Sequence, residues 1–389
     1  MGFRLQGFDI GASGVLEKFG TPRRGIWQSG RGLVGGADSS IYFETGNDGE
    51  FPSADSPLAN SFVKLRASCQ APSLAAPNLS IAHAFTPKNS SVLSIGDTDL
   101  GSSGPILLPG GRVVGGGKEG RVYVLDQGDL TLRQDNSNAD GTKGFQAFVN
   151  TYHSDHSNGA CPGLDKQACI AGAAVPTDKP KFEDLDHGLT STKNCYLAPI
   201  CYQLFQTFGP NIHAGFVYMP SEDPNSGLLY ALAEKEYLRG FRYHAVTGTL
   251  DEQPALTSEQ VRAPEGMPGG AISISANGTR DGIIWVSVHK DDAMTEIRPG
   301  TLFALDANNF QLLWQDKIEA FAKFNPPTVA DGKVFLGEFA ALESISTAHP
   351  AGFGWLNVFG IADQPAPSEA KPYGAPRRKA YGNAYRKPY

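Results

Sequence analysis

The 389-residue sequence predicts an all-β fold made of several small antiparallel sheets, and three observations lead to this prediction. Apolar runs rich in β-branched and aromatic residues are short, and glycine or proline interrupts them every few residues. Glycine (46) and proline (27) are abundant, which favours tight turns over helices. The third observation is that one succession of strands and turns recurs along the chain.

The clearest copy of this repeat spans Asp97 to Asp126, where apolar segments at 105–108, 112–116 and 121–126 are separated by turns that contain glycine. Each segment is predicted to form a strand. Four further copies occupy residues 38–67, 227–250, 281–314 and 326–361. Repetition of one multi-strand unit predicts radial packing of small sheets. We therefore expect a β-propeller of four-stranded antiparallel blades, with about five complete blades in this chain.

The amino-acid sequence of the repeat resembles that of a known family. The phrases GGGKEGRVYVLD (115–126), GTLFALDANNFQLLW (300–314) and VADGKVFLGEF (329–339) resemble the blade sequence of the PQQ-repeat (quinoprotein-like) propellers, over roughly residues 1–361. The resemblance implies a ring of seven or eight blades, so that this chain would be an N-terminally truncated member. Alternatively, Val15–Phe19 supply the missing fourth strand of the last blade and close a shorter ring.

Residues 134–207 interrupt the propeller as a long insertion, and insertions of this length are usually functional or mobile. Four of the five cysteines lie in it, which predicts two local disulfides and hence an oxidising, extracytoplasmic or secreted location; the alternative is four unpaired thiols. These disulfide candidates are Cys161, Cys169, Cys195 and Cys201. A metal site at His153, Asp155 and His156, completed by Asp186 or His187, is weighed against a merely polar loop.

The net charge of −7 conceals a basic C-terminal tail. Residues 362–389 are poor in aliphatic side chains, so we expect a disordered tail that follows the propeller domain of residues 1–361. Its six cations, interleaved with tyrosines, would suit contact with polyanions or aromatic partners, and the alternative is a solvated tail with no specific partner. The body is acidic, which argues against specific nucleic-acid binding, and no apolar run is long enough for a membrane helix.

Charged side chains recur at the ends of the predicted inner strands. In a propeller these strands line the central channel, so the residues would meet near one channel mouth. There they would bind a polar or charged small ligand, or else form a hydrated ring that closes the axis. The candidates are Glu44, Lys118, Glu119, Glu234, Lys235, His289 and Glu338.

The resemblance also raises the question of a quinone cofactor. PQQ with Ca²⁺ is the cofactor that the family implies, but the sequence lacks the adjacent cysteine pair of quinoprotein dehydrogenases and any C-x-x-C-H haem motif. No catalytic residue is assigned. We therefore expect a binding or scaffold module for a protein or glycan partner, and the alternative is a quinoprotein-like oxidoreductase of alcohols or sugars.

Overall fold

A computed structural model describes residues 25–47, 58–68, 78–87, 90–95, 98–133, 145–146, 211–264, 266–291, 293, 296–339, 354–360 and 385–388. The all-β prediction is confirmed: within these ranges the helical content is one short α-helix, α2 (Ser90–Ile95), and two 3₁₀ turns, η1 (Gln28–Gly30) and η2 (Leu100–Ser102). The chain divides into two compact units, one of Met1–Gln28, Gly32–Asn211 and Ala245–Glu252, the other of Ser29–Arg31, Ile212–His244 and Gln253–Tyr389.

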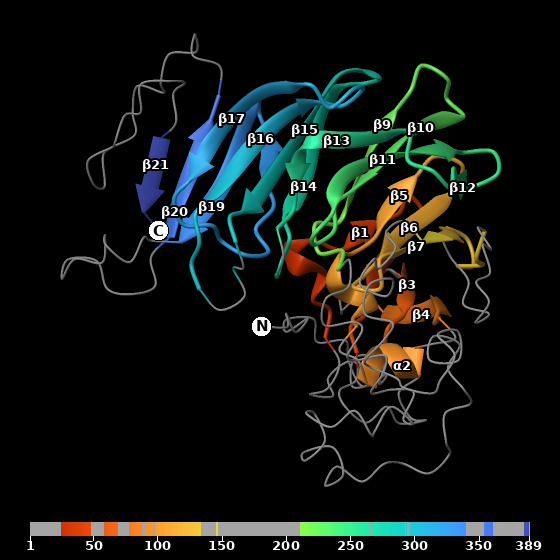
Figure 1. Cartoon of the computed structure of the whole chain (residues 1–389). Helices are drawn as coiled ribbons and strands as arrows, with labels where there is room; N and C mark the ends of the chain where they lie inside the picture. The colour runs from red at the N-terminus through yellow and green to blue at the C-terminus, as the bar shows by residue number, and fades with distance from the viewer. Residues whose placement is uncertain are drawn as a thin grey trace, which may run out of the picture. The chain divides into compact units, whose positions relative to one another are not determined.

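The first unit contains two four-stranded antiparallel sheets, each with its strands in sequence order (Figure 1). The first sheet consists of β1 (Val34–Gly35), β2 (Ser40–Glu44), β3 (Phe62–Ser68) and β4 (Asn78–Phe85). The second consists of β5 (Ile106–Leu108), β6 (Arg112–Gly116), β7 (Arg121–Asp126) and β8 (Phe145–Gln146). Both correspond to repeats that the sequence predicts.

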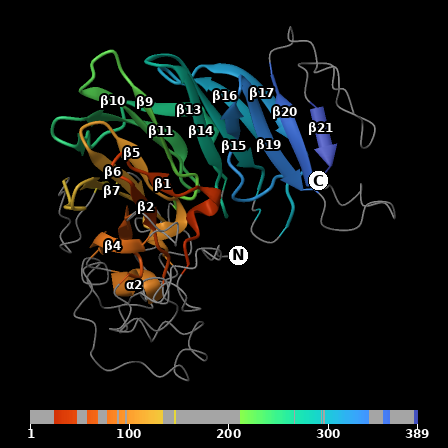
Figure 2. The same ribbon diagram turned by 180° about the vertical axis from the view of Figure 1, so that it is seen from behind.

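The centre of the β1–β4 sheet, in β2 and the first half of β3, is buried on both faces, whereas β4 is partly exposed. Side chains alternate between the two faces of a strand. Tyr42 packs with Phe62 and with Val113 of the neighbouring sheet, whereas Phe43 packs with Val63 on the opposite face. The β5–β8 strands lie beside β2 and β4 in the view from behind (Figure 2), and the shared cluster shows that the two sheets pack face to face.

The second unit contains three sheets. The first has the order β11-β10-β9, with β13 also paired to β11, and the other two are β14-β15-β16-β17 and β18-β19-β20-β21; β12 lies in Ala245–Glu252, a segment of the first unit. Their bounds are β9 (Phe216–Pro220), β10 (Ser226–Ala231), β11 (Tyr237–His244), β12 (Thr249–Leu250), β13 (Leu256–Arg262), β14 (Ala271–Asn277), β15 (Arg280–His289), β16 (Gly300–Asp306), β17 (Leu312–Ile318), β18 (Thr328–Ala330), β19 (Lys333–Phe339), β20 (Gly354–Phe359) and β21 (Tyr385–Pro388).

Consecutive sheets of the second unit pack through apolar faces. Ile284 and Val286 of β15 share a cluster with Tyr230 of β10, on one side of the β14–β17 sheet. On its other side, Leu302 of β16 shares a cluster with Leu336 of β19. The central strands β15 and β16 of the middle sheet are therefore covered on both faces.

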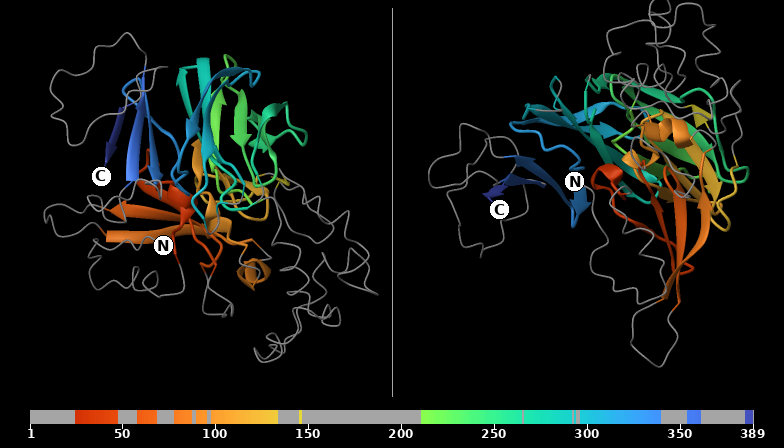
Figure 3. Two further views of the ribbon diagram at one scale, coloured as in Figure 1. Left: turned by 60° about the vertical axis from the view of Figure 1, so that its left-hand side comes forward. Right: turned by 90° about the horizontal axis from the view of Figure 1, so that it is seen from below.

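The outer strand of the last sheet comes from the basic C-terminal segment. Strand β21 pairs antiparallel with β20, with Val358 opposite Tyr385 and Trp355 opposite Pro388. Figure 3 shows it as the dark blue strand at the edge of this sheet, near the C-terminal label. The sequence predicts a disordered tail here, because Tyr385–Pro388 contains two cations and a proline and has little strand propensity. In the structure these four residues form a strand by pairing with the edge of β20. Residues 1–24, including the alternative fourth strand Val15–Phe19, lie outside the described ranges.

The turn between the third and fourth strand of a repeat has the same construction in two sheets. Oδ1 of Asp126 accepts the N–H of Gly128 at 2.8 Å, and Oδ1 of Asp306 accepts the N–H of Asn308 at 2.7 Å. Four residues after each aspartate, the backbone is left-handed: φ is 60° at Leu130 and 59° at Phe310. This conformation favours glycine. The residues at these positions are nevertheless leucine and phenylalanine, and both side chains are buried.

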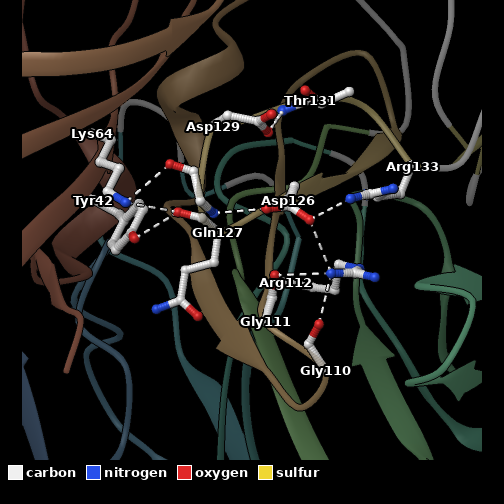
Figure 4. Close-up of polar contacts among 11 residues, drawn as sticks. Tyr42, Lys64, Gly110, Gly111, Arg112, Asp126, Gln127, Asp129, Thr131 and Arg133 are labelled. Carbon is white, nitrogen blue, oxygen red and sulfur yellow. Dashed lines mark hydrogen bonds and ion pairs between the residues drawn. The ribbon is translucent and has the colours of Figure 1, made fainter. Parts of the chain in front are cut away.

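Figure 4 shows how the first of these turns is held in the first unit. Asp126 accepts from Arg112 at 3.1 Å and from Arg133 at 2.5 Å. The carbonyl of Gln127 accepts from the Lys64 ammonium at 3.0 Å and from the Tyr42 hydroxyl at 2.9 Å. Because Lys64 and Tyr42 belong to the β1–β4 sheet, these hydrogen bonds connect the turn of the β5–β8 sheet to the other sheet of this unit.

Candidate functional site

The five inner-strand residues that the sequence selects as channel-mouth candidates are all buried. The exposed fraction is 0% for Glu44, 6% for Lys118, 5% for Glu234, 2% for His289 and 4% for Glu338. Buried polar groups are costly unless they are hydrogen-bonded, so the partners of each side chain decide what it does. Glu44 and Lys118 belong to the first unit, and the other three belong to the second.

Glu44 lies at the end of β2 and faces the β5–β8 sheet. Its Oε2 accepts the N–H of Gly104 at 3.1 Å, and its own N–H donates to Oε1 of Gln28 at 2.9 Å. Oε1 lies so close to Gly115 that a Cβ at that position would be 1.7 Å away. Complete burial raises the pKa of the Glu44 carboxyl well above its ordinary value, which the N–H groups of Gly104 and Gly116 only partly oppose. A neutral carboxyl is thus favoured at this site.

Lys118 forms an ion pair with Asp99, in the segment that also contains Gly104. Its Nζ lies 2.7 Å from Oδ2 of Asp99 and 5.2 Å from the centre of the Trp27 ring. Oδ1 of Asp99 accepts the N–H of Asn47 at 2.9 Å. Segment 99–104 therefore contacts both candidates of this unit, Lys118 through Asp99 and Glu44 through Gly104.

In the second unit, Glu234 is part of a buried polar chain of three side chains. Oε1 of Glu234 lies 3.2 Å from Nε2 of His213, and Nδ1 of His213 lies 3.4 Å from the hydroxyl of Ser29. All three are at least 95% buried. His213 and Ser29 are not among the residues predicted from the sequence, because neither lies in the aligned strand register. In the structure, Ser29 lies in the phrase WQSG (27–30), where φ is positive at Gln28, Ser29 and Gly30.

His289 is fixed as a neutral imidazole by its two backbone partners. Its Nε2 accepts the N–H of Gly269 at 3.1 Å, and Nδ1 donates to the carbonyl of Asp291. An amide N–H can only donate and a carbonyl can only accept, so the proton must sit on Nδ1. Gly269 also lies against Glu234, where a Cβ would be 3.0 Å from Cγ. Gly269 therefore contacts both Glu234 and His289.

Glu338 faces the opposite side of its sheet from the equivalent of His289. It lies on the same face of β19 as Val334 and Leu336, which pack toward the β14–β17 sheet, whereas His289 lies on the same face of β15 as Trp285, which packs toward the β18–β21 sheet. Oε2 of Glu338 accepts the N–H groups of Glu319 at 3.1 Å and Ala320 at 3.3 Å. Asn357 Nδ2 donates to its Oε1. Aligning the repeats by their charged residue thus shifts Glu338 by one position relative to the strand pairing.

The two remaining candidates also have defined partners. Glu119 forms an ion pair with Arg121 at 3.0 Å and accepts from the Tyr123 hydroxyl at 3.3 Å. Lys235 contributes its backbone: its N–H donates to the carbonyl of Pro264 and its carbonyl accepts from Arg262. Glu119 thus contacts strand β7, and Lys235 contacts the end of β13 and the residues that follow it.

Other candidates lie outside the described ranges, and their roles stay predictions. They are His153, Asp155, His156, Asp186 and His187 for the metal site, and Cys161, Cys169, Cys195 and Cys201 for the disulfides. Within the described residues, no group of three His, Cys, Asp or Glu side chains is arranged to hold a metal ion. No helix in those same ranges is both long and apolar enough to cross a membrane.

Comparison with known proteins adds no assignment: no protein-family model matches the chain, and no curated protein matches it either.

Proposed function

We propose that this chain is a PQQ-repeat-like β-propeller that acts as a binding or scaffold module for a protein or glycan partner. The repeat is supported by five small antiparallel sheets among the described residues, each built around one copy of the predicted phrase. Packing of consecutive sheets through apolar faces within the second unit is the packing that blades require.

One observation carries the choice of a binding or scaffold role. Three ionisable side chains at the ends of the inner strands accept hydrogen bonds from backbone N–H groups of adjoining loops: Glu44 from Gly104, His289 from Gly269, and Glu338 from Ala320. Groups held in this way stabilise the loops that connect sheets. A catalytic acid or base must instead reach the substrate proton within hydrogen-bond distance.

Two parallel measurements test this proposal. The purified full chain is applied to an array of defined neutral, acidic and sulfated oligosaccharides, and in parallel it is incubated with PQQ and Ca²⁺, gel-filtered and assayed for dye reduction with alcohols and sugars. We expect saturable glycan binding without retained quinone absorbance. Quinone absorbance that co-elutes with the protein, together with substrate-dependent dye reduction, would replace the scaffold role with that of an oxidoreductase.

Matched variants separate ligand binding from structural roles. If the inner-strand carboxylates hold loops, Glu338→Gln lowers the melting temperature and leaves the affinity for a bound glycan unchanged. If they contact the ligand, the affinity falls while the melting temperature holds. Glu222→Gln serves as the control, because this carboxylate is 78% exposed and paired only loosely with Arg280 at 3.6 Å.

A further inference from the structure

The edge of the last sheet is covered by a strand that pairs over a shorter stretch than its counterpart in the preceding sheet. Strands β16 and β20 are the third strands of their sheets, and β17 and β21 are the fourth. β17 pairs with β16 over six residue pairs. β21 pairs with β20 over four, one of which joins Trp355 to Pro388, a residue without a backbone N–H. The ladder that covers β20 is therefore short and incomplete.

The two fourth strands also differ in sequence. Trp314 and Ile318 of β17 pack in the apolar cluster that joins its sheet to the last one, and the Trp314 ring lies 5.3 Å from that of Phe359. β21 has the sequence YRKP, and its register puts Lys387 opposite Leu356. An apolar residue is the more favourable cross-strand neighbour of a leucine. The sequence of β21 is thus a poor match for the edge that it covers.

The connection that leads to β21 is long for two neighbouring antiparallel strands. Residues 307–311 join β16 to β17, whereas residues 360–384 join β20 to β21. The second connection is about five times as long, so chain entropy makes its closure about tenfold less favourable. A strand with few pairs and a long connection is more easily displaced by a competing strand. The edge of β20 is therefore the place in this sheet where another chain can add a strand.

We propose that the edge of β20 is a strand-addition site for a protein partner, and that β21 is an internal strand that this partner displaces. The partner presents an extended segment with apolar residues at alternate positions and no proline. Its backbone replaces the pairs of β21, and an apolar residue takes the position of Lys387 opposite Leu356. This inference rests on the proposed binding role and deepens it, because it names a protein segment as the ligand of this edge.

Fluorescence anisotropy with a labelled peptide of residues 310–319 (FQLLWQDKIE), which contains β17, tests the site. Arg386→Pro combined with Lys387→Pro removes two N–H groups from β21. This full-length double variant should bind the peptide at least about tenfold more tightly than the unmodified chain does. Arg386→Lys combined with Lys387→Arg is the matched control, because it keeps both charges and both N–H groups. Its affinity should equal that of the unmodified chain.

Methylation of the peptide nitrogens shows whether the peptide adds as a strand. Successive N–H groups of a strand point to opposite sides, so N-methylation of one alternate set should abolish binding and N-methylation of the other should be tolerated. Hydrogen exchange of the unmodified chain needs no substitution. At saturating peptide, the amides of Tyr385–Lys387 should exchange faster, whereas those of Trp355–Val358 should stay protected.

The melting temperature checks that both double variants fold. Equal peptide affinities of the proline variant and its control would overturn the proposal, and so would a peptide whose two methylated forms bind alike. Absence of peptide binding in a chain that binds glycans on the array would refute this inference and leave the proposed binding role standing.

Discussion

Phe310 occupies a position where side-chain packing and backbone conformation oppose one another, and the balance can be measured. Its φ of 59° lies in the left-handed region, which costs a non-glycine residue about 1–2 kcal/mol. Its ring is 5% exposed and lies 5.9 Å from that of Tyr230. Truncation of a buried phenylalanine costs about 3–5 kcal/mol. We therefore expect Phe310→Ala to lower the free energy of unfolding by about 3–5 kcal/mol.

Replacement by glycine distinguishes the two contributions. Phe310→Gly loses the same packing but relieves the left-handed strain, so it should be about 1 kcal/mol more stable than Phe310→Ala. Phe303, in strand β16 beside the same core cluster, is the matched control, because it lies within a regular strand and has no positive φ. There the ordinary preference applies, and Phe303→Gly should be less stable than Phe303→Ala by about 0.5–1 kcal/mol.

The assay is urea unfolding of all four variants, followed by far-UV circular dichroism and compared through their midpoints and slopes. The prediction is a reversal of the order of alanine and glycine between the two positions. If alanine were the more stable replacement at both, the side chain of Phe310 would not be overcoming backbone strain, and our account of the repeated turn would be wrong.

Three further predictions concern the polar contacts. Because burial raises the pKa of the Glu44 carboxyl, the stability that Glu44 contributes is complete below the unfolded pKa of about 4.3 and is lost as pH rises through the folded pKa. Glu44→Gln should therefore flatten the decline of the urea midpoint between pH 5 and pH 8, and an unchanged decline would refute this. Gly115→Ala would put a Cβ 1.7 Å from Oε1 of Glu44 and should cost about 1–3 kcal/mol in urea unfolding, whereas Gly32→Ala, with no atom within 4 Å, should be nearly neutral. The Arg133 guanidinium lowers the pKa of Asp126, with smaller effects from a backbone N–H and from Arg112, so the stability that Asp126 supplies is present at neutral pH and is lost as pH falls through the folded pKa. Asp126→Asn should therefore lower the urea midpoint at pH 7 more than Asp306→Asn, which removes no arginine contact seen among the described residues. Equal losses would contradict the arginine contacts.

Much of the fold follows from local sequence. The Asp-Gly turns and the alternating segments around 121–126 and 300–306 specify strands, because β-branched residues and turn residues act over a few positions. The predicted β-rich architecture agrees with the sheets of the structure, whereas the predicted repeats leave out outer strands such as β4, β9 and β14. Strand β21 could not be predicted, because Tyr385–Pro388 becomes a strand only by pairing with the edge of β20.

The inner-strand candidates show where sequence reasoning ends. Charged residues at the ends of strands can be recognised as a repeated feature, and their burial and hydrogen-bond partners cannot. Glu338 illustrates the reason: a shift of one residue moves a side chain to the other face of its sheet, and alignment on charge does not fix that register. His213 lies 21 residues from Glu234 in sequence, and only folding brings its Nε2 to within 3.2 Å of the carboxylate.

The sequence by itself determined that this chain forms small antiparallel sheets from a repeated phrase, because turn geometry and strand alternation depend on neighbouring residues. Tertiary structure decided which faces of those sheets are covered, which ionisable groups are buried and which backbone N–H groups satisfy them. Those outcomes depend on contacts between residues far apart in the chain, such as Glu44 with Gly104 and Lys64 with the carbonyl of Gln127.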